Sequence, residues 1–590
     1  MPISGGSSHH HQSHFHSIDD WHEHASVDAA YRRVGTILII GGSGVFGSRL
    51  VERLALSCDC RILVAGRTNA RAAQTVAMVS AKRPRAILQP WVLDYRQATP
   101  EALRATGATI VVNAAGPFQG MDLRLTRAAI SAGCHYIDLA DARDYVAGFP
   151  GLNAAAVQSD VLAVCGASST PALSHAALDH LSQAMGTPDQ IRVFISPGNR
   201  APRGLSVMQA ILSYAGQPVQ IREEGLTHAR PGWSLLHRRT LRGLQARWFS
   251  LCETPDLDLI PSRFPQVRTA HFFAGLELSI LHCGLWGLSL LVRARMIASL
   301  SPYASTLLAI ASRLERFGTD RGGMLVEVEG WDANGLRIVS RWGLLAEAGD
   351  GPYIPTLPAL AMIRKLLLGQ ETRRGAQACV GLLTLEDITG EFKELRIQTY
   401  RERLCMEPLF KRAFGARFER MPPSIRELHR PCGTTVFKGI AQVDEASNFI
   451  GTLAARLFRF PPAGSDVPVE VTLQPHGNDE VWLRRFGHSG FSSTLAIDAR
   501  THQLTERFGP VCFTLKIECH KNGLDMSIES ARIGILSLPR FLVPWTRAYE
   551  RIDREGRFTF DVEIGLRGIG RLVRYRGWLR HCRGPTLHTA

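Results

Sequence analysis

The sequence has 590 residues, of which 45% are hydrophobic and 21% charged, proportions typical of a globular protein with three or four domains. Its formal net charge of +15 would suit nucleic acid, an anionic membrane surface or an anionic ligand as a partner. The arginines are spread along the chain, with neither a basic run nor a zinc-finger spacing, so we do not expect a nucleic-acid partner.

The amino-terminal residues 1–30 are polar and rich in histidine, which predicts a disordered tail. An incidental tail is the simpler interpretation, although a metal could bind through His9, His10, His11, His14 and His16. The 12 cysteines contain no C-x-x-C pair, and no secretory signal is visible. We therefore expect a cytoplasmic protein with reduced thiols and no metal site in its folded part.

A glycine-rich turn follows the first apolar segment. Residues 37–40 predict a buried strand, and residues 48–54 predict a helix. The G-x-G-x-x-G pattern between them would let backbone amides and the positive end of the helix approach a pyrophosphate. A structural turn is the alternative, but the strand and helix on either side favour a dinucleotide. We expect the cofactor to contact Gly42, Ser43, Gly44, Val45, Phe46 and Gly47.

Residues 61–66 predict a second strand, which ends at Arg67 and Thr68, with Arg71 one helical turn later. NAD-binding domains place an acidic residue here to hold the ribose 2′-hydroxyl, whereas a guanidinium group binds the 2′-phosphate of NADP. These three residues are therefore assigned to the cofactor, with NADP preferred over NAD. Alternatively, Arg67 is a solvated charge at the end of a strand.

Two further strands supply candidate cofactor contacts. Residues 91–95 fit a strand whose Asp94 would lie near the adenine, unless this residue is an ordinary turn acid. Residues 109–118 fit a buried strand that breaks into a small-residue loop. Strand ends beside the switch point of such a sheet face the cofactor, so the ribose next to the nicotinamide would meet Asn113, Ala114 and Gly116.

Strand patterns continue at residues 136–141 and 161–166, with helical patterns between the strands. This regular alternation predicts a doubly wound, Rossmann-like parallel sheet with right-handed crossovers.

Several short motifs resemble the NADP-binding domain of saccharopine dehydrogenase-like proteins. The motifs are residues 41–47, 65–67, 113–118 and 134–139, and residues 166–171 resemble the turn into the second domain of that family. The resemblance implies a Rossmann domain with an α+β domain inserted before its last elements. It also implies nicotinamide-dependent redox chemistry, often on a C–N bond, without specifying a substrate.

Hydride transfer requires an oriented substrate and a nearby proton source. We assign Tyr136, Asp138 and Asp141 as catalytic candidates because they lie near a strand end that would border the cofactor. His175 follows a small-residue turn, and Arg203 could hold an acidic substrate. Each has a structural alternative: Asp138 caps a turn, His175 is a satisfied helix-start residue and Arg203 is a surface charge.

Residues 171–385 mix helical and strand patterns and predict an α+β substrate or dimerisation domain, whose last part can return to the Rossmann domain. Within it, residues 278–292 and 296–312 carry no charged side chain, but each is too short to span a membrane. One interpretation is two buried helices. The other is a hairpin that lies in a membrane interface or lines a pocket for an apolar substrate.

Residues 386–430 are charge-rich and predict a linker. Residues 431–583 contain apolar positions at alternating sites, which predicts an antiparallel β-rich domain that is half-exposed or curved around a ligand. The segments 482–486 and 575–578 resemble a domain of unknown function (DUF4166) that accompanies some saccharopine dehydrogenase-like proteins.

The predicted architecture is thus a Rossmann domain over residues 31–170, followed by the α+β and β-rich domains. The predicted function is an NADP-dependent oxidoreductase that transfers hydride to or from a small or lipophilic substrate. The alternative is a non-catalytic NADP-binding protein that acts at a membrane surface or as a scaffold. Besides the substrate, the partners considered are a second copy of the chain and a membrane contacted through residues 278–312.

Overall fold

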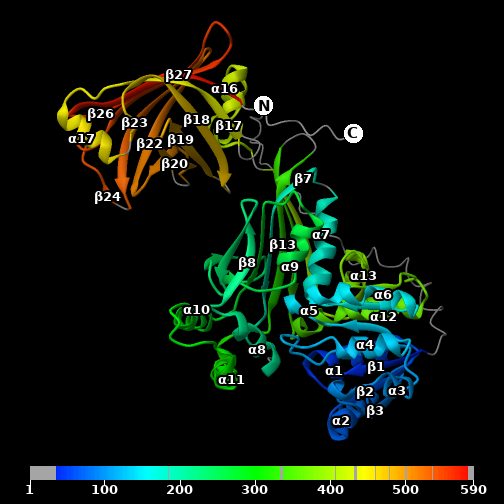
Figure 1. The fold of residues 1–590 in the computed structure, drawn as a ribbon. Coiled ribbons are helices and arrows are strands. Elements are labelled where there is room, and N and C mark those ends of the chain that lie inside the picture. The colour runs from blue at the N-terminus through cyan, green and yellow to red at the C-terminus, as the bar shows by residue number, and fades with distance from the viewer. Residues whose placement is uncertain are drawn as a thin grey trace, which may run out of the picture. The chain divides into compact units, whose positions relative to one another are not determined.

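The computed structural model describes residues 35–581 except 184, 203, 333–335, 406, 431–434, 459, 477–478, 499–500 and 535. The tail predicted over residues 1–30 lies outside this description. The chain forms two compact units, of which the first comprises residues up to 333 and 338–404 and the second begins at Cys405 (Figure 1). Separate hydrophobic clusters stabilise the two units.

A parallel sheet organises the amino-terminal part of the first unit. Within the described residues, its seven strands run in the order β15-β6-β5-β4-β1-β2-β3. All of their pairings are parallel. The strands are β1 (Thr36–Ile40), β2 (Arg61–Gly66), β3 (Ile87–Val92), β4 (Ile110–Asn113), β5 (His135–Asp138), β6 (Leu162–Cys165) and β15 (Gly375–Ala378). The predicted Rossmann-like fold is confirmed.

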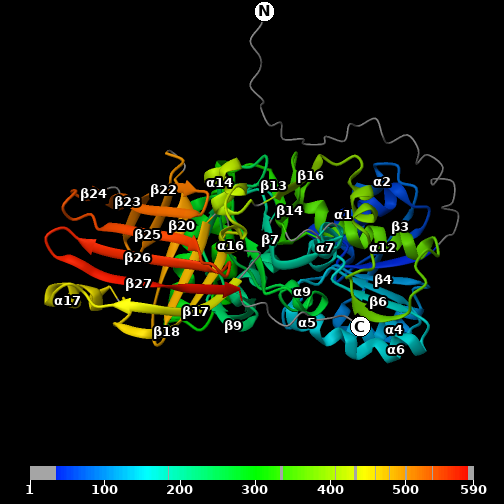
Figure 2. The same ribbon diagram turned by 90° about the horizontal axis from the view of Figure 1, so that it is seen from above.

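Helices cover both faces of this sheet (Figure 2). They are α1 (Val45–Ser57), α2 (Asn69–Ser80), α3 (Pro100–Arg104), α4 (Arg124–Ser131), α5 (Arg143–Gly148), α6 (Asn153–Gln158), α12 (Leu357–Leu367) and α13 (Leu385–Thr389). The apolar runs of β1, β4 and β6 are buried almost throughout, as expected for central strands with helices on both sides. Helix α1 buries Leu50, Val51 and Leu54 at helical spacing, which fixes its start beside the end of β1.

A second, mixed sheet completes the first unit. Its main path in the described residues is β10-β11-β12-β7-β13-β14-β16, and the hairpin of β8 and β9 joins it at β12. Its strands are β7 (Thr187–Ser196), β8 (Pro218–Glu223), β9 (Leu226–Pro231), β10 (His237–Arg239), β11 (Arg247–Leu251), β12 (Thr269–Ala274), β13 (Gly322–Trp331), β14 (Arg337–Ala346) and β16 (Ile397–Cys405). Its helices are α7 (Ser174–Ser182), α8 (Leu205–Tyr214), α9 (Asp256–Arg263), α10 (Ser279–Arg293) and α11 (Ala304–Arg313).

The chain returns to the parallel sheet after this insertion, because α12 packs near α1 and β15 pairs with β6. Residues 386–430 contain ordered elements where the sequence predicts a linker. They contribute β16 to the mixed sheet and then form α14 (Leu409–Phe414), α15 (Ala416–Glu419) and α16 (Pro423–Leu428) in the second unit. Strand β16 alternates between exposed and partly buried residues, so one face can carry its many charges.

The second unit is an antiparallel barrel. Its strand order is β22-β21-β20-β19-β18-β17-β27-β26-β25-β23-β24, and a further pairing of β22 with β23 closes the sheet. The strands are β17 (Thr435–Asp444), β18 (Gly464–His476), β19 (Asp479–Phe486), β20 (Ser489–Ile497), β21 (Leu504–Phe508), β22 (Val511–His520), β23 (Gly523–Ile533), β24 (Leu536–Ser537), β25 (Trp545–Ile552), β26 (Phe558–Leu566) and β27 (Gly570–His581). Helix α17 (Phe449–Leu457) connects β17 to β18. The predicted antiparallel β-rich domain is confirmed, and its closure into a barrel is a further finding.

The uncharged segments 278–292 and 296–312 fold largely as α10 and α11. Both helices bury one side and expose the other. Helix α10 buries His282 and exposes Ile280, and α11 buries Ala311 and exposes Ile310. Among the described residues, the helices are too short or too polar to cross a membrane.

Candidate functional site

The turn between β1 and α1 contains glycines with different physical roles. Gly41 has a φ of +76°, and a Cβ there would lie 2.8 Å from the Ala115 backbone nitrogen. At Gly47, a Cβ would lie 2.1 Å from the Gly41 carbonyl oxygen. Gly44 has an ordinary extended backbone, and its Cβ would meet only the Gly41 oxygen, at 3.1 Å. The turn and the helix packing therefore require Gly41 and Gly47, whereas the bare surface at Gly44 leaves room for a ligand.

The amino terminus of α1 presents free backbone donors at this turn. Gly44 is its N-cap and is exposed, no side chain caps the helix, and the first turn contains no acidic residue. Gly42 is buried, while Ser43, Val45 and Phe46 are partly exposed around the bend. An uncapped helix of 13 residues whose positive end faces outward is suited to bind a phosphate group.

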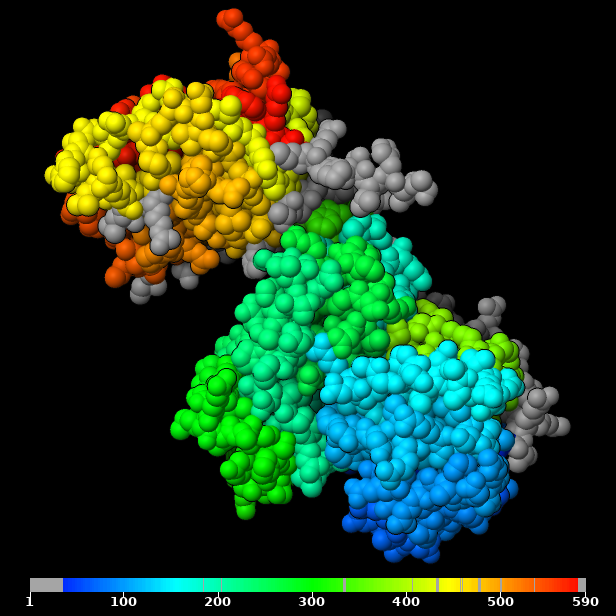
Figure 3. All heavy atoms as spheres, in the orientation of Figure 1, coloured from blue at the N-terminus to red at the C-terminus, as the bar shows by residue number. Residues whose placement is uncertain are grey.

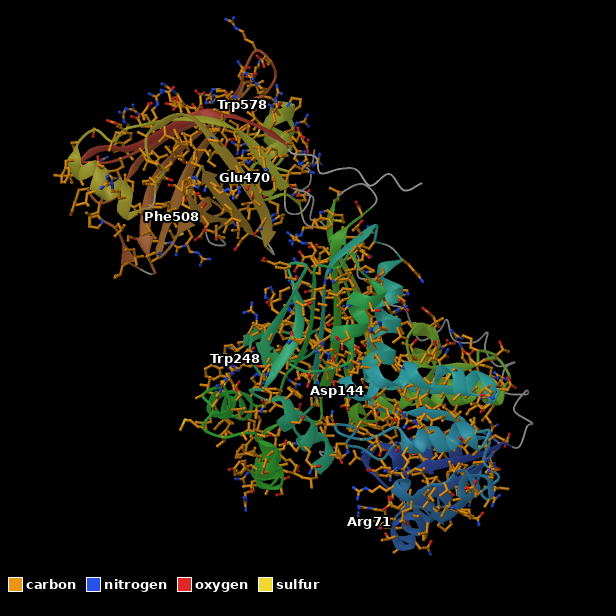
Figure 4. All side chains as sticks on the ribbon, viewed as in Figure 1. Arg71, Asp144, Trp248, Glu470, Phe508 and Trp578 are labelled. Carbon is orange, nitrogen blue, oxygen red and sulfur yellow. The ribbon has the colours of Figure 1, made fainter. Side chains whose placement is uncertain are left out.

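The end of β2 supplies positive charge next to this turn. Arg67 and Thr68 are exposed directly after the strand, and Arg71 is exposed in the first turn of α2 (Figure 4). Neither arginine forms an ion pair within the described part of the chain. The Gly42 amide donates to the Ala65 carbonyl oxygen at 3.2 Å, which ties the glycine turn to this end of β2. Two guanidinium groups without ion-pair partners in the described residues thus follow the strand end that is hydrogen-bonded to the glycine turn.

Asp94 has a local structural role. Strand β3 ends at Val92, earlier than the sequence predicts, and Asp94 then caps a short 3₁₀ helix at Tyr95–Gln97. Its carboxylate accepts a hydrogen bond from the Arg96 amide at 3.0 Å. The assignment of Asp94 to the adenine stays a prediction, and the observed hydrogen bond matches the alternative of a turn acid.

Asn113 shapes the loop after β4 from a fully buried position. Its Oδ1 accepts from the Ala115 amide at 3.0 Å, and its Nδ2 donates to the Tyr136 hydroxyl at 3.3 Å. The Ala114 amide donates to the Ile40 carbonyl oxygen at 2.8 Å, which ties this loop to the end of β1. The loop that contains Asn113, Ala114 and Gly116 therefore lies beside the glycine turn. The buried Asn113 side chain holds the backbone of this loop and does not face solvent.

The three catalytic candidates occupy different environments. Tyr136 is buried and contacts the Tyr145 hydroxyl at 3.1 Å. Asp138 is also buried and accepts from the amides of Gly166 and Ala140, at 2.8 and 3.0 Å. Asp141 is exposed, and its Oδ1 accepts from Gln119 at 3.3 Å. Asp141 is therefore the candidate that solvent or a substrate can reach.

Desolvation raises the pKa of Asp141, against the effect of its hydrogen bond from Gln119. Burial also dominates the titration of the two inner candidates. It raises the pKa of Asp138 to about 6, despite the amide hydrogen bonds that favour the charged carboxylate. Burial likewise raises the pKa of Tyr136 well above its usual value. These shifts disfavour proton release from Tyr136 near neutral pH, so the hydroxyl is suited to positioning Asn113. The catalytic assignments themselves stay predictions.

His175 lies at the start of α7 and is fully buried. Its Nδ1 is 3.0 Å from the Arg263 guanidinium, and its Nε2 is 3.6 Å from the Asp256 carboxylate. Burial and the Arg263 charge lower the pKa of His175 to about 3, while burial raises that of Asp256 to about 7. His175 is thus buried at a helix start, but its Nε2 has no hydrogen-bond partner among the described residues, so the alternative of a satisfied helix-start residue stays a prediction. Arg203 lies outside the described residues.

Helix α8 of the inserted domain lies next to the glycine turn and the loop after β4. The sequence patterns did not predict this contact. The Ser206 hydroxyl donates to the Gly116 carbonyl oxygen at 3.2 Å, and a Cβ at Gly204 would lie 3.7 Å from the Val45 side chain. At the other end of α8, the Tyr214 hydroxyl is 2.9 Å from the Cys252 sulfur. Residues about 90 positions apart meet here, so no local motif could have predicted the contact.

The sequence pattern of the saccharopine dehydrogenase NADP binding domain matches residues 37–181, and that of a domain of unknown function (DUF4166) matches residues 421–579. Residues 37–181 are a saccharopine dehydrogenase-type NADP-binding domain. Both resemblances noted in the sequence are confirmed.

Solved structures similar to the chain include saccharopine dehydrogenase (L-Glu forming) from Saccharomyces cerevisiae, with 12% identity and a TM-score of 0.47. That match covers 62% of this chain and 100% of the yeast protein. A probable dehydrogenase from Thermotoga maritima has 10% identity and a TM-score of 0.31, over 60% of this chain and 93% of that one. No curated protein matches the sequence.

Replacing Gly44 by valine in the saccharopine dehydrogenase-type domain tests the glycine turn. We expect Gly44→Val to weaken NADPH binding by more than about tenfold, a loss above 1.4 kcal/mol, because its side chain occupies the bare surface at the helix end. The thermal midpoint should fall less than in Gly47→Val, because a Cβ at Gly44 would lie 3.1 Å from the Gly41 oxygen whereas one at Gly47 would lie 2.1 Å from it. Calorimetric titration and thermal unfolding measure the two quantities.

Gly47→Val is the matched control. Its Cβ would collide with the Gly41 carbonyl oxygen, so we expect this variant to lose stability, by roughly 1–3 kcal/mol. Normal NADPH affinity in a folded Gly44→Val variant would contradict the assignment of this turn.

The raised pKa of Asp138 predicts a pH dependence of stability. The carboxyl titrates at about 6 when folded and near 3.8 when unfolded, so the folded state binds the proton more tightly and becomes less stable as pH rises between these values. Asp138→Asn removes this titration and keeps an oxygen for the two amides. The unfolding free energy of the wild type should therefore fall relative to that of the variant by about 2–3 kcal/mol between pH 4 and 7, measured by urea unfolding. If the unfolding free energies of the wild type and Asp138→Asn changed equally with pH, the prediction would be refuted.

Proposed function

We propose that the protein is an NADP-dependent oxidoreductase that transfers hydride to or from a small or lipophilic substrate. The observation that carries the proposal is the uncapped, acid-free start of α1 at the exposed Gly44. This arrangement fits a pyrophosphate. The free amides can donate hydrogen bonds to it, the helix dipole favours its negative charge, and the missing side chain at Gly44 lets it approach the backbone. The bound nicotinamide would supply the hydride, while the chain's own residues bind and orient the reactants.

The choice of NADP over NAD follows from charge at the end of β2. Arg67 and Arg71 are exposed and without ion-pair partners in the described residues, so both guanidinium groups are free to bind a phosphate. The position has no carboxylate that would prefer a ribose hydroxyl. Asp94, the nearest acid after β3, already accepts a backbone hydrogen bond.

The substrate would bind where the loop after β4 meets α8. Gly116 and Ser206 are hydrogen-bonded there, and Gln119 contacts Asp141. Of the three catalytic candidates, Asp141 has the exposure that proton exchange with a substrate requires. We therefore propose Asp141 as the proton-transferring group and Tyr136, through Asn113, as a positioning residue.

A turnover assay with two cofactors tests this proposal. With purified protein and a panel of carbonyl and imine compounds, we expect the nicotinamide absorbance of NADPH to fall faster than that of NADH. Arg67→Asp should reverse this order and weaken NADPH binding by about 10- to 150-fold, since it removes a charge-assisted hydrogen bond worth about 1.5–3 kcal/mol. Arg127→Asp, which makes the same charge change on the exposed side of α4, is the control.

Unchanged NADPH affinity in Arg67→Asp would contradict the cofactor choice. Binding of NADPH without turnover of any compound would contradict the oxidoreductase proposal and favour the alternative function below.

The alternative is a membrane-peripheral NADP-binding protein, which the exposed apolar residues of α10 and α11 favour. These helices and the segments next to them form a protruding lobe of the first unit (Figure 3). Ile280 and Met296 are each 72% exposed, and arginines flank the lobe. The arginines are Arg293, Arg295, Arg313 and Arg316. Apolar side chains with adjacent basic groups suit the interface of an anionic bilayer.

Vesicle flotation separates the two functions. If the lobe binds membranes, the wild type should float with vesicles containing phosphatidylserine, and Ile280→Asp/Met296→Asp should not. Met78→Asp/Leu226→Asp removes two side chains of similar exposure elsewhere, 65% and 64%, and should float like the wild type. Flotation that survives the lobe substitutions would show that the lobe is not the membrane contact, and no flotation of the wild type would dismiss the membrane role.

The described cysteines are all free thiols, and many of them are buried. Buried, unpaired cysteines are typical of a reducing compartment, so we propose a cytoplasmic location.

A further inference from the structure

The barrel of the second unit encloses a cavity of about 1190 Å³. Small-molecule sites usually span about 300–1,000 Å³, so this volume accommodates a lipid-sized molecule. Barrels of about eight strands can already hold one small ligand, and the interior widens as strands are added. Side chains of ordinary size therefore leave the interior of this barrel unfilled.

The strand register points apolar side chains into the cavity. On β26, every second residue from Phe558 to Leu566 lines it, whereas the residues between them do not. The register repeats this alternation around the barrel, for example where Val469 pairs with Phe486 and Val562 pairs with Tyr575. Other apolar lining residues are Phe491, Phe508, Leu515, Ile528, Phe560 and Ile564. The wall is thus chemically suited to a hydrocarbon.

A polar group interrupts this apolar wall. Arg484 donates to the Ser493 hydroxyl at 2.7 Å and to Glu506 at 3.1 Å, and its guanidinium lies 4.9 Å from the Trp482 ring centre. The Ser493 hydroxyl also donates to Glu506, at 2.6 Å. Arg484 and Glu506 both line the cavity, and their opposite charges cancel. The group offers hydrogen bonds without net charge.

The two ends of the barrel differ. At one end, the helices α14 to α16 pack into the core through Phe410, Phe418 and Ile425, and the buried His429 pairs with Glu550 at 2.6 Å. The opposite end carries the loop next to Phe508, which lines the cavity (Figure 4). Leu542 also lines the cavity. Leu542 is 50% and Phe458 is 40% exposed although they line the same cavity, so it opens to solvent there.

We propose that this barrel binds an uncharged, lipid-like molecule, with its hydrocarbon against the aromatic wall and a hydroxyl or carbonyl group at Arg484 and Glu506. An uncharged polar end is favoured because Arg484 and Glu506 already neutralise one another. A buried carboxylate or ammonium would lack a counter-charge, which is costly in an apolar interior. The site is independent of the dinucleotide site in the first unit.

Displacement of Nile red, an uncharged fluorophore, from the full-length protein tests this site. We expect the wild type to bind Nile red, and oleyl alcohol to displace it at least about tenfold more effectively than oleic acid or oleylamine, which carry opposite charges. Equal displacement by all three compounds, or no binding of Nile red, would overturn the proposal.

Two variants locate the binding. Val562→Trp places an indole inside the cavity and should abolish Nile red and oleyl alcohol binding. Ile440→Trp adds the same group at a 41% exposed position of β17 that does not line the cavity, and it should change neither. Full binding by a folded Val562→Trp variant would place the fluorophore elsewhere, for example on α10 and α11, and would overturn the proposal. If Val562→Trp does not fold, the proposal is still tested on the wild type, by comparing how effectively oleyl alcohol, oleic acid and oleylamine displace Nile red.

Discussion

The close packing of the β1–α1 turn against its neighbours is the constraint on which the dinucleotide site depends. Gly47 touches the Gly41 carbonyl so closely that no side chain fits, and Gly41 itself abuts the backbone of the loop after β4. This packing holds the start of α1 at the carboxyl edge of the parallel sheet. The helix amides cannot bond within the helix, so they remain directed at a ligand.

Buried polar groups extend this constraint to the loop after β4. Asn113 and Asp138 are buried at the ends of adjacent strands, and each accepts hydrogen bonds from backbone amides of the loops that follow. Their role is to hold main chain in place, which explains why polar residues occupy such buried positions. The nearby groups that are not buried, Asp141 and Ser206, are the ones available to a substrate.

The two units bury their apolar surface in different ways. The parallel sheet of the first unit is covered by helices on both faces and leaves β1, β4 and β6 almost wholly buried. The second unit closes its sheet on itself, so its inward side chains face one another across a space they do not fill. A filled core suits a rigid cofactor platform, whereas a hollow barrel suits a guest molecule.

Local patterns in the sequence determined the Rossmann strands, the glycine turn, the basic end of β2 and the alternation of the β-rich domain, because each is encoded within a few neighbouring residues. Tertiary structure alone decided that β16 lies within the predicted linker and that Asn113 is buried. It also decided that α8 meets the Gly116 loop and that the β-rich sheet closes around a cavity. These features depend on contacts between segments tens to hundreds of residues apart, and such contacts leave no periodicity in the sequence.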